Sequence, residues 1–154
     1  MIALISSVPE EGKKIVREIK TPDVFVSPHL RVIRGKIYNK DVVYAISGMG
    51  KTNAAHVTTI LIEKFSPDMI VLFGVGGAYP ASGLKIGDIA VAEKEVYGDE
   101  GVLTKEGFLG TEIIGIPLLK KGRRKYFNEF QLDKSLIKRV TRFKTGPFVT
   151  VSTC

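Results

Sequence analysis

The sequence predicts an α/β fold with a mixed, largely parallel central sheet. After residue 40, short apolar runs of strand length alternate with stretches of helical hydrophobic spacing, which is typical of parallel strands joined by helices. Before them, two alternating segments at 29–38 and 41–47 flank a turn at 39–41 and predict an antiparallel hairpin. The 154 residues, 44% of them apolar and 25% charged, are enough for one core, so we expect a single domain over 1–154.

The first elements are predicted to be a strand and a helix. The apolar run Ile2–Ile5 has the composition of a strand. Pro9, followed by Glu10 and Glu11, is typical of a helix start, because proline fits the first turn and carboxylates favour the positive end of the helix dipole. A second helix is predicted over residues 52–65.

The stretch 69–101 is expected to hold the functional site. The apolar run Met69–Phe73 predicts a buried strand, and it ends in the glycine-rich segment 74–78, where the backbone can approach a ligand closely. A second apolar run, Ile89–Ala92, leads into residues 96–99. A strand that ends in a glycine platform commonly builds a small-molecule site.

The pattern weakens after Gly101. Residues 104–130 have scattered glycine and proline and few periodic signals, so a long loop is expected there. Residues 133–143 resume helical spacing, with Asp133 as the expected N-cap. Gly146 and Pro147 would end that helix, and a last strand is predicted over 148–152.

Composition excludes several classes of protein. No apolar run reaches about 18 residues, so no membrane span is expected, and the N-terminus lacks the basic region of a signal peptide. Cys154 is the only cysteine, which leaves no disulfide framework or cysteine-based metal site. His29 and His56 have no partner at metal-ligand spacing, so we expect a cytoplasmic protein without a metal or other cofactor.

The net charge of +7 lies in the last third of the chain. Residues 1–100 hold 12 basic and 12 acidic side chains, whereas residues 101–154 hold 11 basic and 4 acidic ones. The basic cluster at 120–125 precedes two aromatic residues, a combination that can serve nucleic acid. No nucleic-acid-binding motif accompanies it, and a solvated loop is the favoured interpretation, so no nucleic-acid partner is expected.

Two glycine motifs fail the tests for nucleotide binding. Gly48-Met49-Gly50-Lys51-Thr52 lies between a strand and a helix, but Ala45 stands where a P-loop needs its first glycine. The segment 74–79 fails as a dinucleotide fingerprint, because Tyr79 and Pro80 stand where a helix should begin. The first motif can still present backbone N–H groups to a ligand, although a plain tight turn explains it as well.

The acidic pair after the first strand has two interpretations. Glu10 and Glu11 are favourable charges at a helix start, and on sequence alone this structural interpretation is the simpler one. The functional interpretation is a general base that polarises a water molecule. No nucleophile elbow or ordered triad supports a serine hydrolase.

These motifs together resemble the nucleoside phosphorylase and nucleosidase superfamily. The likeness runs over the whole chain and is carried by 47–55, by Phe73-Gly74-Val75-Gly76-Gly77-Ala78-Tyr79-Pro80 with the following Gly87-Asp88, and by 95–101 with Gly107-Phe108. The forms of 77–83 and 97–101 most resemble futalosine hydrolase, a nucleosidase of menaquinone biosynthesis. The next most similar branch is methylthioadenosine/S-adenosylhomocysteine nucleosidase. The resemblance implies a three-layer nucleoside phosphorylase-like fold and a homodimer or larger homo-oligomer.

The resemblance also implies roles for individual residues. Glu11 matches the glutamate that activates the attacking water. Residues matching the substrate-binding positions are Met49 beside the ribose and 5′ group, Val75, Gly76 and Gly77 under the ribose and base, and Tyr97 and Phe108 in the region that covers the site. The family's base-stacking residue, ribose clamp and leaving-group acid follow the last predicted strand, so we expect the C-terminal third to be absent from these 154 residues.

The expected activity is hydrolysis of the N-glycosidic bond of futalosine or a related 5′-modified purine nucleoside. A phosphorylase needs a cradle for a phosphate dianion, and acidic residues at 10–11 would repel one. Three alternatives stay open: a methylthioadenosine/S-adenosylhomocysteine nucleosidase, a phosphorylase of the same fold, and a non-catalytic nucleoside-binding module.

Overall fold

A computed structural model describes residues 1–27 and 30–152. The chain forms two compact units, residues 1–77 and residues 78–154. His29 and Cys154, which were expected to bind no metal, lie outside the described residues. That both units belong to one domain stays a prediction. Among the described residues, no helix is long and apolar enough to cross a membrane.

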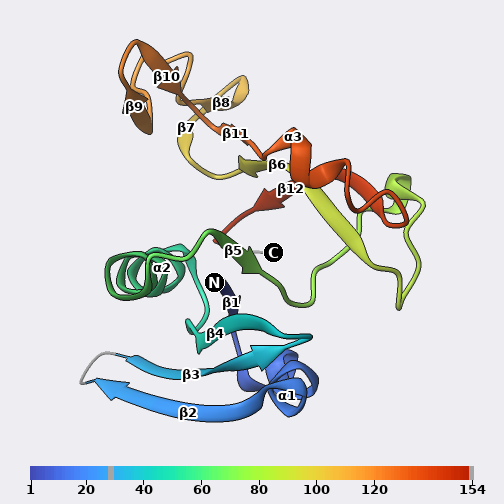
Figure 1. Ribbon diagram of the computed structural model, residues 1–154. Coiled ribbons are helices and arrows are strands. Elements are labelled where there is room, and N and C mark those ends of the chain that lie inside the picture. Colours follow the sequence, from blue (N-terminus) through green and yellow to red (C-terminus); the bar gives the residue numbers. More distant parts are fainter. Residues whose placement is uncertain (28–29, 153–154) are drawn as a thin grey trace. The chain divides into compact units, whose positions relative to one another are not determined.

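Unit 1 is a five-stranded mixed sheet with two helices (Figure 1). Its elements, in chain order, are β1 (Ile2–Ser6), α1 (Pro9–Glu18), β2 (Lys20–Ser27), β3 (Leu30–Ile37), β4 (Lys40–Ile46), α2 (Lys51–Phe65) and β5 (Met69–Leu72). The strand order is β2-β3-β4-β1-β5, in which β1 runs parallel to β4 and β5, while β2, β3 and β4 pair antiparallel. The predicted hairpin, both helices and the mixed sheet are confirmed, and β2 is an addition.

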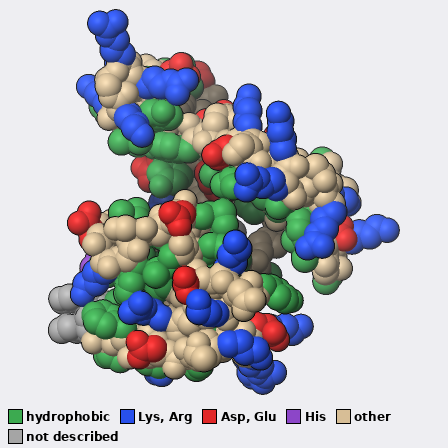
Figure 2. Space-filling model, viewed as in Figure 1, with side chains coloured by type: hydrophobic (Ala, Val, Ile, Leu, Met, Phe, Trp, Pro, Cys, Tyr) green, Lys and Arg blue, Asp and Glu red, His purple; other side chains and the backbone are tan. Residues whose placement is uncertain are grey.

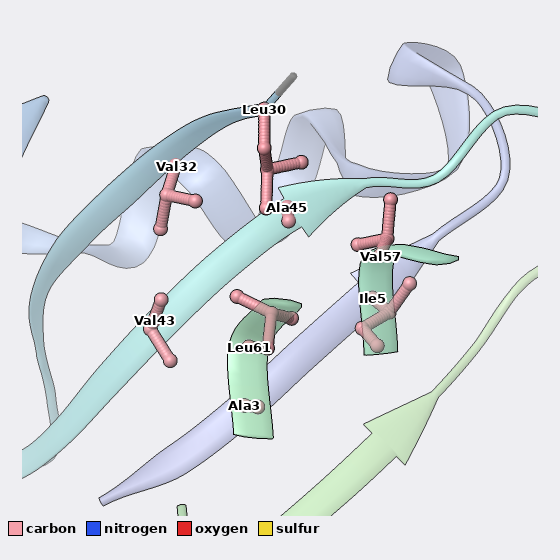
Figure 3. Packing of buried hydrophobic residues seen from close by; sticks show 8 residues of the cluster. All are labelled: Ala3, Ile5, Leu30, Val32, Val43, Ala45, Val57 and Leu61. Atoms are coloured by element: carbon pink, nitrogen blue, oxygen red, sulfur yellow. The ribbon is translucent and has the colours of Figure 1, made fainter. Parts of the chain in front are cut away.

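The two helices cover opposite faces of this sheet, because successive strand residues point to alternate sides. One face packs against α2 through a buried cluster of Ala3, Ile5, Leu30, Val32, Val43, Ala45, Val57 and Leu61 (Figure 3). The other face buries Ile19, Val42 and Tyr44, and Val16 of α1 packs against them. The result is a helix–sheet–helix arrangement within unit 1.

Unit 2 is built mainly from short strands (Figure 1). Its elements are η1 (Pro80–Ser82), β6 (Ala90–Tyr97), β7 (Gly101–Thr104), β8 (Gly107–Gly110), β9 (Leu119–Lys121), β10 (Arg124–Tyr126), β11 (Glu129–Gln131), α3 (Lys134–Ile137) and β12 (Lys144–Thr150). The strand β6 lies between β11, which is antiparallel to it, and β12, which is parallel. The hairpins β7–β8 and β9–β10 complete the unit, and Figure 2 shows basic side chains projecting from β9–β10.

Two sequence predictions for unit 2 are wrong, and the last predicted strand, at 148–152, is confirmed with different bounds, as β12. The expected loop at 104–130 contains β8, β9, β10 and the start of β11, and no alternating pattern reveals these strands because most of their side chains are exposed. The expected helix at 133–143 is only the single turn Lys134–Ile137, although Asp133 does cap it by accepting a hydrogen bond from the Ser135 N–H. Pro147 lies inside β12 at a register shift, which a proline without an N–H tolerates.

Candidate active site

Three neighbouring parallel strands of unit 1 end at one edge of the sheet. In the register of the ladders, Ser6 at the end of β1 lies beside Ile46 of β4, and Ile5 lies beside Leu72 of β5. The chain leaves these ends as the turn into α1, the turn into α2 and the glycine-rich segment after β5. In open α/β sheets, ligands bind outside the carboxyl ends of the strands, so this edge is the candidate site.

The Glu11 carboxylate is held at this edge by three backbone N–H groups. The N–H groups of Ser7 and Val8 donate to Oε2 over 2.9 and 3.2 Å, and the N–H of Val75 donates to Oε1 over 2.9 Å. The first two come from the β1–α1 turn and the third from beyond β5. The carboxylate therefore joins segments that lie 64 residues apart in the sequence.

The peptides that donate to Glu11 are fixed from their other side. The N–H of Ser47 donates to the Ser6 carbonyl over 2.9 Å, and the N–H of Gly48 donates to the Ser7 carbonyl over 3.1 Å. Each of these two peptide groups thus accepts a bond from the segment after β4 and donates one to Glu11. Hydrogen bonds in such chains polarise and strengthen one another.

This environment keeps Glu11 ionised. The hydrogen bond from the Val75 N–H is the largest cause that lowers the pKa of Glu11, burial opposes it, and the bonds from Val8 and Ser7 lower it further. A carboxylate has about four acceptor positions, and three backbone bonds leave room for one more donor. A half-buried, ionised and oriented carboxylate can bind and polarise a water molecule.

Gly74 makes this arrangement possible, and sequence reasoning did not single it out. A Cβ at position 74 would lie 2.9 Å from Cδ and 3.1 Å from Oε2 of Glu11, and closer still to Oε1. Any side chain there would displace the carboxylate. The sequence signal was the glycine-rich segment itself, but it did not indicate which glycine meets Glu11.

The structure brings together only some of the predicted site residues of unit 1. Val75 contacts Glu11 through its backbone, while its side chain is 90% exposed. Gly76 and Gly77 follow it, and each faces open space. Met49 is 75% exposed and has no hydrogen bond to Glu11 among the described residues. It lies in a turn between two glycines of positive φ, and the Asn53 side chain donates to its carbonyl over 2.7 Å.

The other two predicted residues, Tyr97 and Phe108, line a groove in unit 2. Its walls come from β6, β8 and the segment 125–129, and they include the aromatic residues Tyr126 and Phe127. The ring of Phe130 lies between Tyr97 and Tyr126, at 5.5 and 5.9 Å from their centroids. The sequence placed both residues in a covering region, and the structure brings them to one groove.

Asn128 holds this groove together and was missed by sequence reasoning. Its Nδ2 donates to the carbonyls of Tyr97 and Glu100, both over 2.7 Å. Its Oδ1 accepts from the N–H and the hydroxyl of Thr111, over 2.8 and 2.9 Å. One amide therefore ties three segments of unit 2, and no local pattern could reveal partners so far away in sequence.

Comparisons with known proteins agree on one family. The model of the Phosphorylase superfamily matches residues 1–154. The 5′-methylthioadenosine/S-adenosylhomocysteine nucleosidase of Staphylococcus haemolyticus is 34% identical over 140 residues, which are 91% of this chain and 56% of that protein. The enzyme of the same name from Oceanobacillus iheyensis is 30% identical over 94% of this chain and 64% of its own length. The chain thus spans little more than half the length of such relatives.

Solved structures show the same fold. The MTA/SAH nucleosidase of Streptococcus pneumoniae in complex with 8-aminoadenine superposes with a TM-score of 0.81 at 24% identity, covering 99% of this chain and 64% of that one. A futalosine hydrolase mutant of Helicobacter pylori gives a TM-score of 0.75 at 21% identity, covering 99% and 68%. These matches confirm the predicted α/β nucleoside phosphorylase-like fold.

Proposed function

This chain belongs to the Phosphorylase superfamily, and we propose that its Glu11 site serves the hydrolysis of the N-glycosidic bond of a purine nucleoside. The observation that carries the proposal is the Glu11 carboxylate, ionised and anchored by three backbone N–H groups at the ends of parallel strands. The curated relatives named above are nucleosidases. Since those relatives are longer, the activity and substrates of the whole protein belong to this proposal.

In the proposed reaction, Glu11 orients a water molecule toward the anomeric carbon and accepts its proton. The water oxygen bonds to that carbon, the bond from the carbon to the base breaks, and the departing base takes up a proton from solvent. Its fixed carboxylate also favours the positive charge that develops on the sugar as the bond to the base lengthens, because an oriented charge needs no reorganisation during the reaction. Gly76 and Gly77 leave open space next to Val75, where the ribose and base would lie.

Hydrolysis is favoured over phosphorolysis by the way the site uses its donors. Backbone N–H groups at a helix start are the usual ligands of a bound phosphate. Here the N–H groups of Ser7 and Val8, at the start of α1, already donate to Glu11. The carboxylate therefore occupies the place where an anion would bind. A phosphate dianion would be repelled by the charge of Glu11 and would find these two N–H groups already hydrogen-bonded.

The substrate class is a 5′-modified purine nucleoside. The names of the curated relatives favour methylthioadenosine and S-adenosylhomocysteine over the futalosine branch that the motifs at 77–83 and 97–101 predicted. Futalosine hydrolysis stays a prediction, as do the homo-oligomer, the cytoplasmic location, and the roles of Met49, Tyr97 and Phe108.

The test is the release of free base from methylthioadenosine and from futalosine by the purified chain, with and without phosphate. We expect release without phosphate and its loss in Glu11→Gln, in which an amide NH₂ would face a backbone N–H. Glu10→Gln is the matched control, because Glu10 is exposed on the same turn. Release that requires phosphate would indicate a phosphorylase. Nucleoside binding without any release would overturn the proposal in favour of a binding module.

A further inference from the structure

A buried pair of hydroxyl groups lies directly beneath the turn that carries Glu11. Tyr44 of β4 is 2% exposed and Ser6 of β1 is fully buried, and their oxygens are 2.8 Å apart. Ser6 Oγ also donates to the carbonyl of Val8 over 3.0 Å. Ser6 and Tyr44 lie on the neighbouring parallel strands β1 and β4.

Counting hydrogens assigns the direction of this chain. A serine hydroxyl has one hydrogen, and Ser6 uses it on the Val8 carbonyl. The Tyr44 hydroxyl must therefore donate to Ser6 Oγ. The hydrogen bonds therefore run from the Tyr44 hydroxyl to Ser6 Oγ, and from Ser6 Oγ to the Val8 carbonyl. The preceding peptide group contains the Val8 N–H, which donates to Glu11.

The Tyr44 hydroxyl also supports the helix that bears Glu11. A Cβ at Gly12, the residue after Glu11, would lie 2.9 Å from Cε2 of the Tyr44 ring and closer still to its hydroxyl. The first turn of α1 thus rests on this ring. Tyr44 therefore touches both halves of the arrangement: the helix turn that presents the carboxylate and, through Ser6, the turn that presents its donors.

We propose that Tyr44 is a positioning residue for Glu11, with its hydroxyl holding Ser6 and the Val8 peptide so that the backbone N–H groups of the β1–α1 turn stay aimed at the carboxylate. A tyrosine that merely fills the core would need only its ring, whose neighbours on this face are apolar. The kinetic consequence rests on the proposed function, whereas the placement of the carboxylate does not.

The first experiment follows the titration of the Glu11 carboxyl by NMR in Tyr44→Phe. Loss of the hydroxyl should loosen the donors, so we expect the pKa of Glu11 to rise toward the ordinary glutamate value. Tyr38→Phe is the matched control, because it removes the same hydroxyl from a tyrosine that is 93% exposed. An unchanged Glu11 titration in folded Tyr44→Phe would overturn the proposal.

The second experiment measures turnover of the same variants. We expect kcat to fall about tenfold in Tyr44→Phe with KM changed less than about twofold, since a displaced base costs rate rather than substrate affinity. Equal kinetics in the Tyr44 and Tyr38 variants would contradict the positioning role. If the wild-type chain shows no turnover at all, the proposed function fails, and the NMR titration still decides the role of Tyr44.

A third variant guards against misfolding. Ser6→Ala removes the middle of the chain and leaves the Tyr44 ring in place. It should raise the pKa of Glu11 as Tyr44→Phe does, and circular dichroism checks that both variants fold. A folded Ser6→Ala protein whose Glu11 titrates as in the wild type would refute the link.

Discussion

Gly74→Ala isolates the contact on which the Glu11 site depends. The added Cβ would lie 2.9 Å from Cδ of Glu11, a separation that real Cβ atoms essentially never show. Either the carboxylate moves away and loses the bond from the Val75 N–H, or the backbone shifts. A hydrogen bond to a charged group is worth about 1.5–3 kcal/mol, so we expect the free energy of unfolding of Gly74→Ala to fall by about that amount relative to Gly76→Ala.

Gly76→Ala is the matched control for this prediction, because a Cβ at position 76 would meet nothing within 4 Å. Both variants reduce the freedom of the unfolded chain equally, which by itself stabilises by about 0.4–1 kcal/mol. The difference in the free energy of unfolding between the two variants, measured with urea, therefore gives the cost of the contact between the added Cβ and Glu11. If Gly74→Ala were as stable as Gly76→Ala, with an unchanged Glu11 titration, the account of Gly74 would be wrong.

Two further predictions concern unit 2. Asn128→Ala should lower the free energy of unfolding by about 2–3 kcal/mol, because four hydrogen bonds are lost; Asn53→Ala, which loses one exposed bond, should cost less than about 1 kcal/mol in the same urea assay. Burial raises the pKa of Glu95, and a hydrogen bond with Thr150 opposes this. The ionised form of Glu95 therefore lowers the free energy of unfolding at pH values above the raised pKa. Glu95→Gln should raise Tm at pH 7, but it should not raise Tm at pH values below the ordinary pKa of glutamate. A similar rise in Tm at pH 7 from Glu93→Gln, at an exposed glutamate of the same strand, would contradict the role of burial at Glu95.

The sequence predicts unit 1 well because its patterns are local. Apolar runs of strand length are followed by Pro9 with acidic neighbours and by the helix at 52–65, and each of these signals lies within a few residues of the element it predicts. Glu11 and Val75 were predicted for the site by resemblance, and their direct contact needed the structure. The buried hydroxyl of Tyr44 is invisible in sequence because its partner, Ser6, lies 38 residues away.

The short strands of unit 2 cannot be predicted from local sequence patterns, for a physical reason. Its strands β8 to β11 have only three or four residues each, and most of their side chains are exposed, so no period of two develops. The polar links of Asn128 instead join segments next to these strands, namely Thr111 after β8 and Tyr97 and Glu100 before β7. Hydrogen bonds between residues so far apart in the sequence leave no local pattern that could be recognised.

The glycine-rich segment after β5 combines two different requirements that the sequence cannot separate. Gly74 must lack a side chain because the Glu11 carboxylate lies against it, and this requirement belongs to the folded chain alone. Gly76 and Gly77 meet no neighbour and need no left-handed backbone, so the fold itself does not demand glycine there. On the proposed function, a side chain at either position would enter the space of the ribose and base. The stability of Gly76→Ala therefore separates what folding requires of this segment from what a nucleoside would require.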